Sequence, residues 1–325
     1  MESVADFVFG PQPPIEEEPA AEEEPAALAA AAEPAPAAAA AADQLRDLAG
    51  LAGKWTGQGF NVIWRPHPVQ PSGQDRFLEL NVTSEQLDFG PALLDVPNRG
   101  LLMKNISLAG LSYLQQIADA NTNKNQHFEP GVWITVPHTS DPNEPRTVAR
   151  LASIPHGTTI LLQGTAQTKA GGPTIPTVSI KPFPDNLGHP PTSADRIDFP
   201  EQHLGTPTPF RTSGAGLTGI TQQMVNNPNR VLRAAPSPPI TSTTRLQVSS
   251  RGTAIPGGGT SNIAFLQGGT DGPNARAVRV TATFWLETLQ GDTEPRRLQY
   301  SQLVLLNFNG ISWPHVTVAT LLKQA

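Results

Sequence analysis

The chain has 325 residues, enough for one large domain or two modest ones, and its net charge is −6. It contains no cysteine, which excludes disulfides, zinc–thiolate sites, iron–sulfur clusters and cysteine nucleophiles. Any metal therefore needs nitrogen and oxygen ligands, or a cofactor such as heme. The acidic residues gather near the N-terminus and no basic stripe with interleaved aromatic residues occurs, which argues against nucleic-acid binding.

The expected location follows from features that the sequence lacks. No run of about 18 apolar residues occurs, so we predict no transmembrane helix and no membrane partner. Residues 1–6 carry neither the positive charges nor the apolar stretch of a secretory signal. We therefore expect a cytoplasmic protein.

Residues 1–44 form a low-complexity segment of glutamate runs, proline and alanine. Such a composition buries too little apolar surface to offset the entropy of the chain, and it predicts a disordered tail. Within this tail, residues 3–10 hold an apolar cluster, Val4, Phe7, Val8 and Phe9. A short apolar motif on a flexible tether is typical of a docking or targeting peptide, such as those that load cargo enzymes into protein shells. An inert disordered end is the plainer alternative.

The folded domain is expected to span residues 45–325 and to open with a short helical turn capped by Asp43. The clearest strand is 278–287, where every second residue is apolar, and Asn309-Gly310 is typical of a tight hairpin turn. Strands are predicted at 77–82, 131–136, 158–164, 278–286, 299–308 and 313–322. Many short strands separated by Gly, Pro and Asn indicate an all-β barrel or sandwich.

A proline-rich stretch at about 168–245 interrupts this pattern. A loop of that length is unusual inside a compact domain, so we interpret it as an insertion draped over the barrel, with a lid as one interpretation of its role. Residues 216–225 predict one short helix within it.

Three histidines, His127, His156 and His315, lie in or beside predicted strands. Imidazole is the commonest protein metal ligand, and three neutral rings in one barrel would bind Fe, Mn, Cu or Zn with positions left for water, dioxygen or substrate. Glu129 lies on the same strand face as His127, where it would complete the ligand shell or orient the imidazole. Two plainer readings stay open: strand histidines are more often structural, and the turn at His156 would also place it at a solvent-facing rim.

Arg150 is a charged residue in an otherwise apolar predicted strand. Two partners are expected for it. It would pair with Glu129, or it would close the barrel end against an aromatic face.

Four segments, in the correct order, resemble the nitrobindin-like heme-binding proteins, a branch of the calycin barrels. They are the Gly-x-Trp-x-Gly-x-Gly opening at 53–59, the His-x-Glu-x-Gly segment at 127–133, the strand pair at 148–160 and the C-terminal strand at 314–323. The resemblance implies that His315 is the proximal heme ligand and that Trp55 plugs the barrel base. His156 stands where that family has a threonine. A second imidazole there would make heme six-coordinate, or would let the three histidines hold a bare ion.

The sequence thus predicts an all-β, calycin-like antiparallel β-barrel with a disordered N-terminal tail. The first functional hypothesis is a metal-dependent oxidoreductase. In it heme b, or one Fe or Mn ion held by the histidines and Glu129, activates dioxygen or peroxide toward a small hydrophobic substrate. The alternative is a non-enzymatic carrier or sensor of heme or another hydrophobic ligand, since such a barrel encloses one small ligand. A structural module with incidental histidines is the third hypothesis, and the oligomeric state stays open.

Overall fold

The structure is a computed structural model that describes residues 35–67, 75–212, 214–251 and 258–324. The predicted docking motif at 3–10 and most of the predicted disordered tail lie outside these residues. The described chain begins with helix α1 (Ala35–Leu45), which continues directly into the 3-10 helix η1 (Arg46–Leu51). The prediction that Asp43 caps a helix is wrong. The helix already begins in the alanine run, and alanine has the highest helix propensity.

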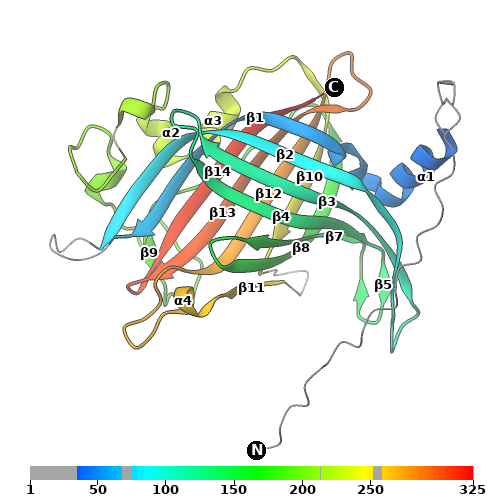
Figure 1. Cartoon of the computed structure of the whole chain (residues 1–325), viewed down its shortest axis with the longest axis horizontal. Helices are drawn as coiled ribbons and strands as arrows, with labels where there is room; N and C mark the ends of the chain where they lie inside the picture. Colours follow the sequence, from blue (N-terminus) through cyan, green and yellow to red (C-terminus); the bar gives the residue numbers. More distant parts are fainter. Residues whose placement is uncertain (1–34, 68–74, 213, 252–257, 325) are drawn as a thin grey trace, which may run out of the picture. The chain divides into compact units, whose positions relative to one another are not determined.

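Ten long antiparallel strands of the described chain form a closed barrel (Figure 1). Their order is β1-β2-β3-β4-β7-β8-β10-β12-β13-β14, and β14 pairs with β1 to close the sheet. Their bounds are β1 Gly53–Pro66, β2 Arg76–Asn98, β3 Ile106–Asp119, β4 Asn125–Val136, β7 Thr147–Ile154, β8 Thr158–Ala170, β10 Ile240–Ser249, β12 Arg276–Leu289, β13 Pro295–Phe308 and β14 Ile311–Lys323. This up-and-down order confirms the predicted all-β class and antiparallel β-barrel, and it fits a calycin-like fold.

The remaining elements are short. Two small strands form a separate hairpin, β9 adds to β14 and β11 adds to β8. Their bounds, with those of the short helices, are β5 Thr139–Ser140, β6 Asn143–Glu144, β9 Phe183–Pro184, β11 Gly259–Asn262, η2 Pro200–Gln202, η3 Gly214–Gly216, α2 Gln222–Asn226, α3 Asn229–Ala234 and α4 Ala264–Gln267. No helix within the described ranges is long and apolar enough to cross a bilayer.

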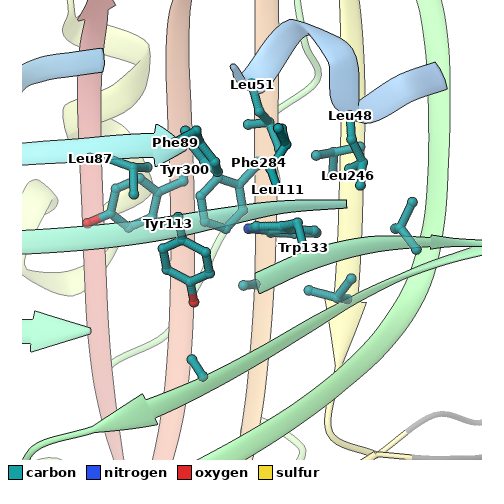
Figure 2. Close-up of a cluster of buried hydrophobic side chains, with 14 of the residues drawn as sticks. Leu48, Leu51, Leu87, Phe89, Leu111, Tyr113, Trp133, Leu246, Phe284 and Tyr300 are labelled. Atoms are coloured by element: carbon teal, nitrogen blue, oxygen red, sulfur yellow. The ribbon is translucent and has the colours of Figure 1, made fainter. Parts of the chain in front are cut away.

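Side chains that point into the barrel form an apolar core at the end where η1 lies (Figure 2). Leu48 and Leu51 reach into this core from η1, and strand residues such as Trp133 and Phe284 meet them from the walls. Trp55 is fully buried in the same core, and its indole N–H donates to the carbonyl of Leu51 at 2.7 Å. Its position agrees with the plug that the family resemblance implies.

A second apolar core lies on the outer face of β1, β2 and β14. Successive strand side chains point to opposite faces, so Phe60, Val62 and Trp64 face away from the barrel interior. All three are fully buried because Ile180, Leu217 and other residues of the segment between β8 and β10 pack on them. The outer face of these strands is therefore apolar and covered, where a simple barrel would be polar and exposed.

That covering segment is the predicted proline-rich insertion. Its true limits are residues 171–239, narrower than the predicted 168–245, because β8 ends at Ala170 and β10 begins at Ile240. It is tied to the barrel by hydrogen bonds from Trp64 Nε1 to the carbonyl of Ile180 at 2.9 Å and from Leu78 N to the carbonyl of Phe210 at 2.9 Å. These contacts make the insertion a cover of the outer wall, whereas a lid would close the interior. The short helix predicted at 216–225 is α2.

Candidate functional site

A belt of buried polar side chains crosses the barrel interior beyond the apolar core. Its first half joins three strands through Tyr113, Glu129 and Arg150. One carboxylate oxygen of Glu129 accepts hydrogen bonds from Tyr113 Oη and from the Arg150 guanidinium. Arg150 also donates to Tyr113 Oη at 2.8 Å and to Gln302 Oε1 at 2.7 Å. Both partners predicted for Arg150 are found, because its guanidinium also lies 5.3 Å from the ring centre of Phe284.

The charges of this ion pair are stabilised by each other. Burial alone would raise the pKa of Glu129, but the Arg150 guanidinium, helped by hydrogen bonds from His127 and Tyr113, lowers it to about 2. The same carboxylate, with the Tyr113 phenol, holds the pKa of Arg150 above its ordinary value against the effect of burial. Glu129 is therefore ionised and Arg150 charged at all physiological pH values.

The second half of the belt centres on Glu85, which the sequence analysis did not single out. Tyr300 Oη donates to Glu85 Oε2 at 2.5 Å, and Thr83 Oγ1 donates to Glu85 Oε1 at 2.8 Å. Gln115 Nε2 in turn donates to Tyr300 Oη at 2.9 Å. Burial raises the pKa of Glu85 from 4.5 to about 7, and these hydrogen bonds only partly oppose that rise. Glu85 thus differs from Glu129 in having neutral partners only.

His315 lies on the inward face of β14, on the same side as the core residues Ala319 and Leu321. Its direct neighbours across the ladder are Ile63 on β1 and Val304 on β13. The ring lies deep in the protein yet keeps some accessible surface. Burial, with the fields of His127 and His156, lowers its pKa to about 3, so His315 is neutral at physiological pH.

The other two histidines lie together at the same end of the barrel, which we call the histidine end. The rings of His127 and His156 are nearly parallel, with centroids 5.6 Å apart. His127 Nε2 lies 3.2 Å from Glu129 Oε2, so the carboxylate orients this imidazole. His156 sits in the turn between β7 and β8 and is exposed, and burial of part of its ring with the nearby His127 lowers its pKa.

The predicted ligand set is thus only partly brought together. Within the described residues, no group of three or more His, Asp or Glu side chains is arranged to hold a metal ion. Glu129 already has both carboxylate oxygens engaged, one by Arg150 and Tyr113 and the other by His127. Of the two roles expected for Glu129, the geometry favours orienting His127. Within the described ranges, the side-chain hydrogen-bond partner of His315 is Thr317, whose Oγ1 lies 3.4 Å from its Nε2.

The pKa of Glu85 makes protein stability depend on pH. The unfolded chain releases this proton near pH 4.5, whereas the folded protein keeps it until about pH 7. Glu85 should therefore contribute a loss of about 3 kcal/mol as pH rises across this window, seen as the difference between wild type and Glu85→Gln because His315, with its lowered pKa, changes stability in the opposite direction in both proteins. We expect Glu85→Gln to lack this loss, which urea unfolding of both proteins at a series of pH values would measure. Parallel stability curves for the two proteins would contradict the assigned environment of Glu85.

Comparison with known proteins adds little to this picture. No protein-family model matches the chain, and no curated protein matches it. Among solved structures, the chain is similar to the crystal structure of Rv2717c from M. tuberculosis, with 13% sequence identity and a TM-score of 0.40. The similarity covers 87% of this chain and 98% of that one. The strand order of the chain itself defines the closed antiparallel barrel.

Proposed function

We propose that the histidine end of the barrel binds a metal cofactor through His315 and uses it for oxidative chemistry on a small hydrophobic substrate with dioxygen or peroxide. The observation that carries this proposal is His315 itself. It is a deep, neutral imidazole that lines the interior and has one weak hydrogen-bond partner among the described residues. A neutral imidazole is the form that ligates metals, and a buried ring with so few hydrogen bonds is costly unless something binds it.

Heme b suits these residues better than a bare ion. A bare Fe or Mn ion would need several converging protein ligands, and no such group of three is arranged within the described ranges. Heme needs one axial imidazole, and apolar side chains should flank it. His315 offers that nitrogen, with Ile63 and Val304 directly beside it on the two neighbouring strands.

A heme bound there would supply the redox centre. The chain itself would hold and orient it and control protons nearby. Glu129 fixes the His127 ring through Nε2, which leaves Nδ1 of His127 as the nitrogen free to exchange a proton with a ligand. The Glu129–Arg150 pair keeps that arrangement rigid.

Titration with hemin tests the role of His315. Wild-type protein should give one saturating Soret change per chain, and His315→Ala should weaken binding by more than about 100-fold, because even residues that only support a ligand cost 10–100-fold. His138→Ala is the matched control, since His138 is exposed and contacts Asn143 in a remote turn. Absence of saturable binding to the wild type, or equal binding by His315→Ala, would contradict the proposal.

A second candidate is a carrier or sensor of heme without turnover. The pairing of Glu129 with Arg150 favours it, because this ionised carboxylate is not free to act as an acid or base. Peroxide consumption by the hemin-loaded protein in the presence of a small phenol separates the two candidates. An oxidoreductase should turn over many times per heme, whereas a carrier should bind heme with no turnover above that of free hemin.

A further inference from the structure

Among the described residues, one of the two glutamates inside the barrel has a cationic partner and the other has none. Glu129 and Arg150 cancel each other, and His315 is neutral. Glu85 is almost fully buried, and its carboxyl group accepts hydrogen bonds from the neutral hydroxyl groups of Tyr300 and Thr83. Asp119, opposite Thr83 on β3, also has neutral partners only within the described ranges, but hydrogen bonds from Thr122 and Asn81 lower its pKa against the effect of burial, so it is already ionised and has no proton to release.

The hydrogen-bond partners of Glu85 suit both the protonated and the ionised form of its carboxyl group. A hydroxyl group both donates and accepts, so Thr83 can donate to an ionised Glu85 or accept from a protonated one at the same oxygen. Tyr300 continues to donate to the other oxygen in both states, since Gln115 anchors it. A change of charge at Glu85 therefore needs only the turn of one hydroxyl hydrogen.

Glycine at position 59 reserves the space that this arrangement occupies. A Cβ atom at Gly59 would lie 2.5 Å from Glu85 Oε1, 2.7 Å from Thr83 Oγ1 and closer still to the carbonyl oxygen of Val318, so a larger residue here would displace these groups. Gly59 therefore leaves room both for the β14 backbone and for the carboxyl group of Glu85.

We propose that Glu85 is the counter-charge for a cation bound at the histidine end. It is protonated when no cation is present and becomes ionised when one binds, so that binding releases one proton to solvent. This inference rests on the proposed function, because the positive charge is that of the ferric iron–porphyrin centre that His315 would ligate.

The fields inside the barrel support this coupling. The charged or titratable groups that act on Glu85 are His127 on β4 and Tyr300 on β13, with the Glu129–Arg150 pair beyond them. The electrostatic field of His127 lowers the pKa of Glu85 and also that of His315. A positive charge at the histidine end therefore acts on both residues. Because burial holds the pKa of Glu85 near 7, a modest added field is enough to ionise it.

The protonated acid is tested first without any cofactor. Infrared difference spectra between pH 6 and pH 9 should show the C=O band of a buried carboxylic acid in the wild type, and Glu85→Gln should lack it. Tyr300→Phe is the second variant. It removes the donor to Oε2, so the band should persist to higher pH. A wild type without this band would overturn the inference.

Proton release on loading is tested next, in weakly buffered solution at pH 6 with hemin as the probe. Wild type should release about one proton more than Glu85→Gln, and the variant should bind hemin about tenfold more weakly. Glu287→Gln is the matched control and should behave as wild type, because Glu287 is a buried acid paired with Arg297 on the outer wall. Equal release by wild type and Glu85→Gln would overturn the inference while leaving the proposed function intact.

Failure of hemin to bind the wild type would instead count against the proposed function. The same release measurement would then be made with Zn²⁺ as the cation. Proton release that depends on Glu85 would support the counter-charge. No such release with either probe would overturn it.

Discussion

Replacing Arg150 by methionine should lower the free energy of unfolding by about 3–5 kcal/mol at pH 7, the cost of removing one partner of a buried ion pair. Arg150 is 1% exposed and Glu129 is fully buried, so the variant would leave an uncompensated carboxylate inside the barrel. Tyr113 and Gln302 would each lose a donor as well. Denaturant unfolding measures this loss.

The pH dependence of the Arg150→Met variant shows which charge is responsible. In the wild type, Arg150 holds the pKa of Glu129 at about 2, below its ordinary 4.5, so the stability from this pair is present above pH 4.5 and is lost as pH falls toward 2. The difference in free energy of unfolding between wild type and variant should therefore become smaller at acidic pH. Adding Glu129→Gln to Arg150→Met should recover part of the loss at pH 7. A variant within 1 kcal/mol of wild type would refute the structural role of the belt.

Replacing Trp64 by alanine should cost about 3–5 kcal/mol, the usual cost of removing a buried tryptophan. Trp64 is fully buried on the outer wall, where its ring packs on Trp313 and Phe199 with centroid distances of 5.3 and 5.8 Å. It also donates to the carbonyl of Ile180 in the insertion at 2.9 Å. Thermal unfolding and limited proteolysis should show lower stability and faster cleavage within residues 171–239.

Leu322→Ala is the control for this prediction, since Leu322 lies on β14, the strand paired with β1, but is 53% exposed. It should change stability by less than about 1 kcal/mol. Equal effects of the two substitutions would show that the insertion does not cover a second core.

Strands with one apolar and one polar face could be predicted from the sequence. The alternation at 278–287 marks β12, and the Asn309-Gly310 turn joins β13 to β14 with positive φ angles of 51° and 69°. β3 was missed because its inward face carries belt residues such as Gln115 and Tyr113, which removes the contrast between its faces. β1 also lacks the alternation of apolar and polar residues, because its outer face is apolar where the insertion covers it.

Only those contacts of the site that join residues close together in the sequence could be predicted. Glu129 follows His127 by two residues on one strand, so their contact could be expected before the structure was known. Glu85 and Tyr300 meet across the barrel interior from strands far apart in the chain, and only the register of the closed barrel brings them together. A glutamate at an inward strand position is the signal that would have identified Glu85.

The central claim is that His315 ligates a metal cofactor. Its most direct test is the absorption spectrum of the protein as isolated, combined with elemental analysis of the same sample. Our account predicts a Soret band with about one iron per chain in the wild type, and neither in His315→Ala. A wild-type sample supplied with heme during expression that shows no Soret band and no stoichiometric metal would contradict the account.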